Sequence, residues 1–271
     1  MTVFQALVLG ILQGLSEFLP ISSSAHLALA PWILGWQDPG LAFDVALHFG
    51  TLIAVLWYFR AEWIALIIAA KDIVVRRRIE TERERRVLYL IIATIPGAIA
   101  GLALEKQAES TFRSPTLVAT ALIVMGIVLW AVDRFAPRDR LLSQMRWTDA
   151  LLTGLAQMFA IIPGVSRSGS TISAARALRF TREDAAVFSF LMSMPIIAAA
   201  AVLKMPQALR EQGLSPQMIA GVLASAISGW LAITVLLRVV IRHSYGVFAA
   251  YRIILGAAVL IAVAYRGVGH A

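Results

Sequence analysis

Residues with reactive side chains gather in two short stretches of an otherwise apolar chain. The first stretch, QGLSEFLPISSSAH (13–26), holds a glutamate, three adjacent serines and a histidine. Gln13 and Glu17 lie four residues apart and therefore share one face of a helix. Pro20 ends that helix, and the serines can cap the next helix, which carries His26 in its first turn. A glutamate can move a proton or hold a divalent metal, and a hydroxyl or an imidazole can attack phosphorus.

The second stretch, PGVSRSGST (163–171), has the composition of an anion site. Small hydroxyl and glycine residues precede and begin a helix whose exposed N–H groups and dipole favour a negative charge. Arg167 adds a planar, permanently charged fork suited to phosphate oxygens. An arginine that extends to the membrane surface is the alternative, and it suits Arg176 and Arg179 well. It suits Arg167 poorly, because glycines and serines offer its stem little apolar surface.

Together the two stretches supply a nucleophile, a proton acceptor and a cation, the groups that phosphoryl transfer needs. Asp44 and His48, four residues apart at the start of an apolar segment, are weaker candidates for supporting this group. The sequence has no P-loop, no H-E-x-x-H and no G-x-G-x-x-G at a strand-to-helix turn, so nucleotide-driven and zinc-protease chemistry lose support. Its lack of cysteine excludes disulfides, thiolate metal ligands and cysteine nucleophiles.

The elements that must position these residues are membrane helices. Of the 271 residues, 59% are hydrophobic and 15% are charged, and the mean hydropathy is +0.79. A soluble domain carries about 25% charged residues. The net charge of +8 would suit a nucleic-acid partner, but the basic residues lie in short loops, where they orient the protein in the membrane. Crossings are predicted at 43–59, 87–104, 114–132, 185–203, 216–237 and 246–265.

Lysine and arginine counts set the predicted topology. The 71–86 segment holds seven basic residues and the 133–149 segment four arginines, so we expect both on the cytoplasmic side. Six crossings then leave both termini outside. Two apolar regions with polar centres remain, at 3–36 and 150–180, and each must return to its starting side as a re-entrant hairpin. Non-helical backbone at membrane depth is tolerated only inside protein or beside water, so these hairpins mark the functional centre.

The two hairpins resemble each other, which predicts an inverted repeat. ALVLGILQ (6–13) matches ALLTGLAQ (150–157), and a proline and a serine-rich loop follow in each. Three crossings follow each hairpin, an odd number, so the halves have opposite orientations, as in many transporters. We therefore expect an all-α integral membrane protein with six transmembrane helices and two re-entrant hairpins. Its single membrane domain (1–271) consists of inverted repeats at about 1–140 and 141–271.

At these residues the sequence resembles the bacterial undecaprenyl pyrophosphate phosphatase family, also called bacitracin-resistance proteins. The family shows an (E/Q)xxxE motif followed by F-L-P-(I/V)-S-S-(S/T)-x-H, and a PGxSRSxxT motif. QGLSEFLPISSSAH and PGVSRSGST match both, in the expected order, and the resemblance extends over the whole chain. It implies a membrane enzyme that removes the terminal phosphate of a C55 polyprenyl pyrophosphate and regenerates the monophosphate carrier for peptidoglycan and other envelope polymers. The family's fold, six helices and two hairpins in an inverted repeat, agrees with the charge pattern.

The resemblance also assigns site residues. The family's catalytic positions correspond to Glu17, Ser23, His26 and Arg167. Ser23 is favoured as nucleophile with His26 or Glu17 as base, while attack by the histidine or by water stays open. The expected substrate-binding residues are Gln13, Ser22, Ser24, Ser166, Ser168 and Thr171. Because many members have glutamate where Gln13 stands, a metal bridged by two carboxylates loses support, but Mg²⁺ or Ca²⁺ could still bind through Glu17 and the pyrophosphate.

These inferences predict a multi-pass protein of the bacterial inner membrane whose active site opens to the periplasmic side. Its partners would be the lipid substrate and the surrounding membrane lipid, with no nucleic acid, and it could form a homodimer. The rival class is a transporter or flippase for an anion or a lipid phosphate, since inverted repeats and helix termini directed at an anion are typical of transporters. A transporter does not need a serine, a histidine and a glutamate beside its anion site.

Overall fold

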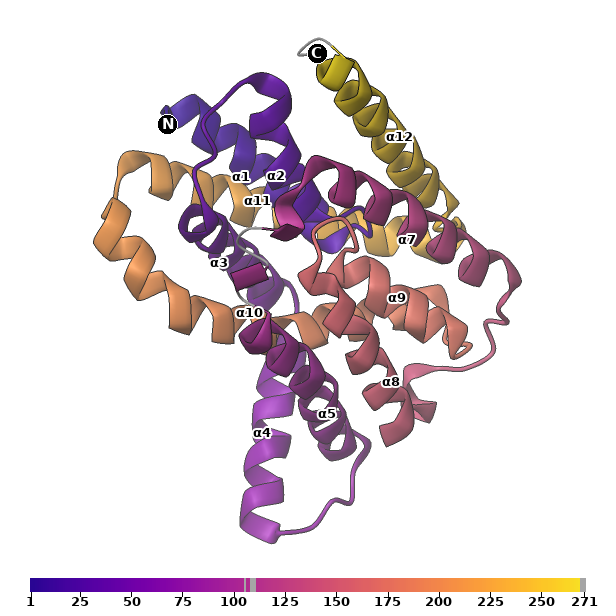
Figure 1. Ribbon diagram of the computed structural model, residues 1–271. Coiled ribbons are helices and arrows are strands. Elements are labelled where there is room, and N and C mark those ends of the chain that lie inside the picture. The colour runs from indigo at the N-terminus through magenta and orange to yellow at the C-terminus, as the bar shows by residue number, and fades with distance from the viewer. Residues whose placement is uncertain (105, 108–110, 269–271) are drawn as a thin grey trace.

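The computed structural model describes residues 1–104, 106–107 and 111–268 and is helical almost throughout (Figure 1). The helices are α1 (Val3–Phe18), α2 (Ser23–Leu34), α3 (Leu41–Tyr58), α4 (Arg60–Arg76), α5 (Glu82–Ala103), α7 (Pro115–Phe135), α8 (Trp147–Met158), α9 (Arg167–Ala177), α10 (Arg182–Gln212), α11 (Pro216–Arg242) and α12 (Gly246–Val268). The 3-10 turns are η1 (Thr111–Arg113), η2 (Leu142–Gln144) and η3 (Phe159–Ile161). The described residues form no strand, only an isolated bridge between Arg140 and Phe180.

Five helices are long and apolar enough to cross a membrane, namely α5, α7, α10, α11 and α12. A sixth crossing results if Ala42–Tyr58 and Arg60–Arg76, bent by 83° at their junction, count as one span. The predicted fold class, an all-α integral membrane protein, is therefore confirmed. The helix α3 covers almost the same residues as the crossing predicted at 43–59, and the bend follows at Phe59, before α4, a helix that the sequence analysis did not predict. Neither proline nor glycine marks Phe59, so the sequence carried no signal for it.

Two hairpins of short helices, α1–α2 and α8–α9, hold the polar motifs. Their helices have at most 16 residues, fewer than the about 20 that a crossing needs. The two breaks share one backbone geometry, since Ser22 has φ 76° and Ser166 has φ 72°. Each serine caps the helix that follows, with Ser22 Oγ accepting from the Ala25 N–H and Ser166 Oγ from the Gly169 N–H. The interruptions thus fall where the sequence predicts them, and the re-entrant placement in a membrane stays a prediction.

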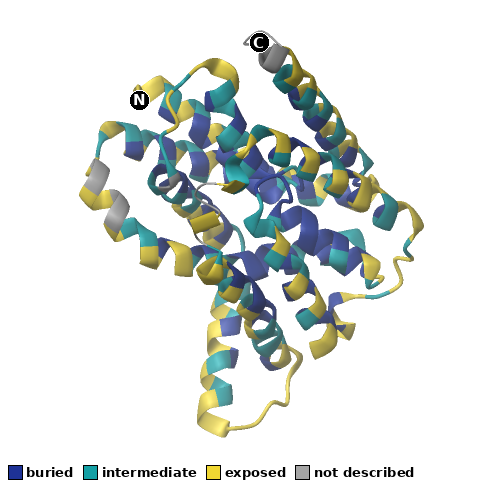
Figure 2. Ribbon diagram, viewed as in Figure 1, coloured by how far each residue is buried: buried dark blue, intermediate teal, exposed yellow. Residues whose placement is uncertain are grey.

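Each hairpin packs against a helix from the other half of the chain. In the interior α1 lies along α11, and α8 lies along α5. Glycines permit these close approaches, because a Cβ on Gly14 would overlap the side chain of Ser228, and one on Gly154 would come within 2.8 Å of Ala93 Cα. Figure 2 shows the resulting buried centre in dark blue, and large apolar side chains cover much of the outside, as lipid surroundings require.

Arg176 on α9 is not the surface-seeking residue that the sequence predicted. Its side chain is fully buried, and its Nε donates to Asp133 Oδ1 at 3.2 Å while its other N–H groups bond three backbone carbonyls. Arg182 binds the same carboxylate at 2.7 Å. The partner lies 43 residues away in sequence, so local composition could not reveal it. Arg179, in contrast, is exposed and pairs with Asp139, and its place at the membrane surface stays a prediction.

Candidate active site

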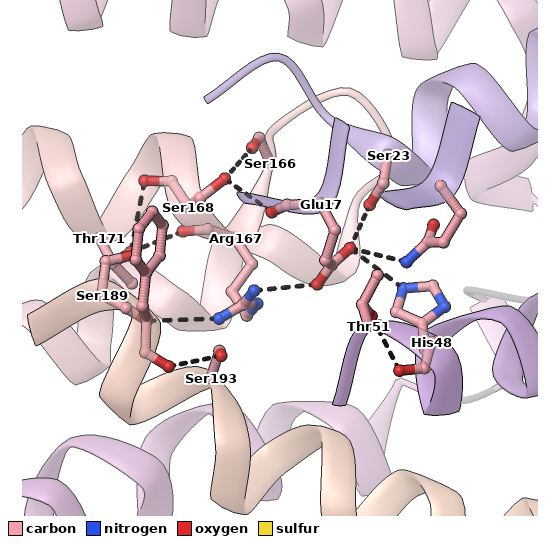
Figure 3. A network of polar contacts seen from close by, with 12 residues as sticks. Glu17, Ser23, His48, Thr51, Ser166, Arg167, Ser168, Thr171, Ser189 and Ser193 are labelled. Atoms are coloured by element: carbon pink, nitrogen blue, oxygen red, sulfur yellow. Dashed lines mark hydrogen bonds and ion pairs between the residues drawn. The ribbon is translucent and has the colours of Figure 1, made fainter. Parts of the chain in front are cut away.

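Glu17, in the last turn of α1, is the centre of a buried polar network (Figure 3). Only 5% of its surface is exposed. One carboxylate oxygen, Oε2, accepts hydrogen bonds from Ser23 Oγ at 2.5 Å and Gln13 Nε2 at 3.0 Å, and lies 3.5 Å from His48 Nε2. The other, Oε1, accepts from Arg167 Nη2 at 2.9 Å. Residues 150 positions apart therefore meet as the sequence motifs predict.

Ser23 and Arg167 reach Glu17 from equivalent positions. Each is the first residue of its helix, α2 or α9, and each directly follows the serine with positive φ that caps that helix. The backbone turn at this serine brings the first helical side chain to the break, where the free N–H groups and the helix dipole also favour an anion. A hydroxyl and a cation are thus directed at one carboxylate and at whatever anion binds beside it (Figure 3).

Three of the predicted substrate-binding residues bond other protein groups, and two of them, Ser22 and Ser168, join the two hairpins. Ser168 Oγ donates to the carbonyls of Leu19, at 3.0 Å, and Glu17, at 3.2 Å, groups that the end of α1 leaves without helical partners. Thr171 Oγ1 donates to the Arg167 carbonyl and bonds a serine hydroxyl on α10. Ser22 Oγ accepts from the Gly164 N–H at 3.1 Å, a direct bond between the two breaks. These side chains fix the geometry of the network.

A cavity of about 300 Å³ opens beside the network. Its polar lining residues are Glu17, Ser23, Ser24, His48, Gln157, Ser166 and Arg167, and its apolar ones include Val45, Gly97, Gly101, Met158, Ala160, Ile161, Ile196, Ile197 and Ala200. The cavity therefore combines a cationic, hydroxyl-rich wall with an apolar wall, which suits a ligand with a charged head and a hydrocarbon chain.

His26 does not join this group. Its Nδ1 lies 2.7 Å from the Ser22 carbonyl oxygen and its Nε2 lies 2.7 Å from the hydroxyl of Tyr251 on α12. The imidazole also stacks on the Tyr251 ring, with 5.7 Å between ring centroids, and it does not line the cavity. Both ring nitrogens are engaged away from Glu17, so the structure separates His26 from the residues with which the sequence motif grouped it.

The structure adds polar residues that the sequence ranked low or passed over. His48, expected only to support the site, lines the cavity and contacts Glu17 directly. Gln157, used in the sequence only to align the two hairpins, lines the cavity with a buried Oε1 that has no hydrogen-bond partner. Arg252 is fully buried in the second turn of α12. A charged residue inside an apolar span is by itself a signal of function, and it could have identified Arg252 from the sequence.

The donor set around Glu17 does not fit a metal ion held by the protein. The described residues contain no group of three histidine, cysteine, aspartate or glutamate side chains placed to share an ion. Both Glu17 oxygens already accept hydrogen bonds, one of them from a guanidinium. A divalent cation prefers several oxygen ligands, and here the protein offers one carboxylate that is already paired.

The fold and the site together define an integral membrane protein that holds a serine, a carboxylate and an arginine in its core. The chain belongs to the family described as bacitracin resistance protein BacA, whose model matches residues 6–258. It is 61% identical to the undecaprenyl-diphosphatase of Gemmatimonas aurantiaca over 98% of this chain and 100% of that protein. It is 51% identical to the undecaprenyl-diphosphatase of Pelotomaculum thermopropionicum over 99% of this chain and 100% of that protein. The predicted family is therefore confirmed.

Proposed function

We propose that this protein hydrolyses undecaprenyl pyrophosphate to undecaprenyl phosphate and inorganic phosphate, and so recycles the lipid carrier for peptidoglycan and other envelope polymers. The observation that carries the proposal is Glu17, which accepts a hydrogen bond from Ser23 on one oxygen and from Arg167 on the other beside a cavity with an apolar wall. The proposed proton acceptor, Glu17, thus contacts both the proposed nucleophile and the proposed phosphate-binding cation. The names of relatives that match nearly the full chain support the same activity.

The first step is attack by Ser23 on the terminal phosphorus. Glu17 Oε2, 2.5 Å from Ser23 Oγ, takes the hydroxyl proton as the new O–P bond forms. The bond from phosphorus to the bridging oxygen breaks, and the lipid monophosphate leaves. Arg167 and the N-terminus of α9 stabilise the charge on the phosphoryl oxygens.

The second step returns the enzyme to its starting state. A water molecule attacks phosphorus, and the bond between phosphorus and Ser23 Oγ breaks. Glu17 returns to Ser23 Oγ the proton that it took in the first step, and inorganic phosphate leaves with the oxygen and protons of the water. His48, 3.5 Å from Glu17 Oε2 and facing the cavity, is placed to stabilise the carboxylate as its charge changes. In this assignment Glu17 is the base, and His26 supports the hairpin from its contact with Tyr251.

The predicted substrate-binding residues divide into two roles. Ser24 and Ser166 line the cavity and can donate to pyrophosphate oxygens. Gln13, Ser22, Ser168 and Thr171 bond other protein groups and hold the network in place. An anion or lipid-phosphate transporter on the same fold would need the cation but not the hydroxyl at 2.5 Å from a carboxylate, and the hydrolase is therefore favoured.

Phosphate release by the purified protein tests the proposal directly. Wild-type protein in detergent is incubated with a polyprenyl pyrophosphate, and Arg167→Ala serves as the inactive comparison. We expect release from wild type and a loss of about 10²-fold or more in the variant. If wild type binds the lipid but releases no phosphate, while Arg167→Ala loses binding, the transporter becomes the better assignment.

We further propose that the protein lies in the bacterial inner membrane with the active site open to the periplasmic side. The support is the basic 71–86 and 133–149 segments, which favour the cytoplasm. In Figure 1 the α4–α5 turn lies at the bottom, and the start of α1 and the end of α12 lie at the top. Single cysteines at the exposed positions Gln37 and Arg78 can be treated with a membrane-impermeant maleimide in intact spheroplasts. Labelling at Gln37 alone supports this orientation, and labelling at Arg78 alone reverses it.

We also propose a homodimer, because twofold dimers are the commonest homo-oligomers. Light scattering of the detergent-solubilised protein, corrected for bound detergent, separates a dimer from a monomer of 29.4 kDa.

A further inference from the structure

Arg252, on α12, is a fully buried cation whose hydrogen bonds all go to backbone carbonyls. Its Nη1 donates to the Pro20 carbonyl at 3.0 Å, and its Nη2 donates to the carbonyls of Gly164 at 2.6 Å and Val165 at 2.9 Å. Its Nε reaches the Leu122 carbonyl on α7 at 3.3 Å. No acidic side chain in the described part of the chain forms an ion pair with it.

The carbonyls that Arg252 binds belong to the two helix breaks. Pro20 lies between α1 and α2, and Gly164 and Val165 directly precede the serine that caps α9. Carbonyls at such interruptions have no helical partner, and each one left unpaired inside a membrane protein costs several kcal/mol. One guanidinium satisfies the backbone of both breaks, and the partial negative charge of these carbonyls compensates its positive charge.

A glycine, Gly169, leaves the space that the Arg252 guanidinium fills. A Cβ on Gly169, in the first turn of α9, would come within 2.5 Å of Arg252 Nη1. Any larger residue at Gly169 would therefore push against the guanidinium. The guanidinium occupies space that only a glycine leaves open beside the second break.

Arg252 is linked to the reacting groups through very short pieces of backbone. Pro20 is three residues from Glu17 and three from Ser23, and Val165 is two residues from Arg167. Arg252 itself does not line the cavity. A change in its bonds would therefore shift Glu17 and Ser23 relative to Arg167 without removing any group that touches the substrate.

We propose that Arg252 is a positioning residue for phosphoryl transfer, which joins the two helix breaks in the register that places Glu17 and Ser23 against Arg167. The proposal rests on the hydrolase function proposed above. An arginine is required because its planar fork reaches the carbonyls of both breaks at once. A lysine carries the same charge as a compact ammonium without that fixed fork geometry.

Two variants of Arg252 and one control separate positioning from general stabilisation. Arg252→Met removes the charge and the donors at similar volume, and Arg252→Lys keeps the charge alone. Arg238→Met, at an exposed position near the end of α11, removes one arginine without touching either hairpin. For each protein, kcat and KM are measured for polyprenyl pyrophosphate in detergent, at a temperature below the unfolding midpoint of every variant.

The second measurement does not depend on activity. Because the chain has no cysteine, spin labels can be attached to Leu15→Cys on α1 and Leu155→Cys on α8, two outward-facing positions that are each 41% exposed. Pulsed electron paramagnetic resonance then gives the distribution of distances between the hairpins. Arg252→Met should broaden or shift this distribution, and Arg238→Met should leave it as in wild type.

We expect Arg252→Met to lower kcat by about 10²-fold with little change in KM, because a misplacement of about 1 Å is enough for such a loss. Arg252→Lys should fall between Arg252→Met and wild type in both measurements. Gly169→Ala, which keeps the arginine but crowds it together with Ser166, should lower kcat in the same direction. Arg252→Lys, which keeps the charge, decides the question if Arg252→Met does not fold.

Unchanged kcat in Arg252→Lys and Gly169→Ala would overturn the proposal. A lower unfolding midpoint in Arg252→Met with wild-type kcat would do the same, because it would show a structural role alone. A changed distance distribution with unchanged kcat would also refute it. If wild type releases no phosphate, the proposed hydrolase function fails, and an unchanged distance distribution in Arg252→Met would then separately show that Arg252 does not join the hairpins.

Discussion

Replacement of Glu17 by glutamine tests the central contact of the site. The amide has the size of the carboxylate, so packing around the end of α1 is preserved. It cannot take the Ser23 proton, and it no longer places a negative charge 2.9 Å from Arg167. Loss of the base acts on kcat, and loss of the negative charge beside Arg167 acts on KM, so the two effects can be measured separately.

The expected loss lies in kcat. Removal of a positioned base costs about 10²- to 10⁴-fold, which corresponds to about 3–5 kcal/mol of transition-state stabilisation. KM should stay the same or fall, because Arg167 loses the carboxylate that competes with the pyrophosphate for its N–H groups. Arg167→Met should instead raise KM and lower kcat together, because the proposed mechanism has Arg167 bind the phosphate oxygens in both the ground state and the transition state.

The assay is phosphate release from undecaprenyl pyrophosphate over a range of substrate concentrations. Glu62→Gln is a matched control, because Glu62 pairs with Arg86 on α5 outside the cavity, and its kinetic constants should stay close to wild type. Wild-type kcat in Glu17→Gln would remove Glu17 from the role of base. A higher KM with unchanged kcat would show that Glu17 binds substrate instead.

Three further predictions follow from the described contacts. Ser23→Ala should lower kcat by about 10²-fold or more and abolish any phosphoenzyme trapped by acid quench, whereas a trapped phosphohistidine would identify another nucleophile. His48→Gln should reduce kcat more than His26→Gln, because only the first residue lines the cavity, and the reverse order would return His26 to the catalytic group. Arg176→Ala should cost about 3–5 kcal/mol of stability through loss of a buried ion pair, measured as the thermal midpoint in detergent, while the exposed Arg179→Ala should stay within about 0.5 kcal/mol of wild type.

The sequence predicted the fold class because membrane helices follow from local composition. Apolar length identified α5, α7, α10, α11 and α12, and the prolines with their serine-rich loops identified both helix breaks. The bend at Phe59 could not be predicted, because no helix-breaking residue marks it and the two helices pack against different partners, α3 against α10 and α11 and α4 against α5. The burial of Arg176 escaped prediction for a related reason, since its partner Asp133 is brought to it only by the fold.

The sequence predicted that the two motifs meet in one site. It did not predict which side chains of the motifs point into that site. The likeness of the two hairpins brought Glu17 and Arg167 together in the sequence analysis, as the structure does at 2.9 Å. His26 follows Ser23 by three residues, yet His26 faces Tyr251 on α12 whereas Ser23 faces Glu17. That separation depends on the exact start of α2 at the positive-φ Ser22, which sequence periodicity does not resolve.

The two helix breaks share one backbone conformation but present different side chains, a hydroxyl in one and a guanidinium in the other. Ser22 and Ser166 have nearly the same φ, each caps the helix that follows, and each places the next side chain at the centre of the protein. In the first hairpin that side chain is the hydroxyl of Ser23, and in the second it is the guanidinium of Arg167. Glu17 is the only carboxylate that lines the described cavity and it contacts both, so the pair of breaks forms one asymmetric site instead of two equivalent ones. Such an arrangement works only if the breaks keep their relative register, and this requirement gives the buried, carbonyl-bound Arg252 its physical purpose.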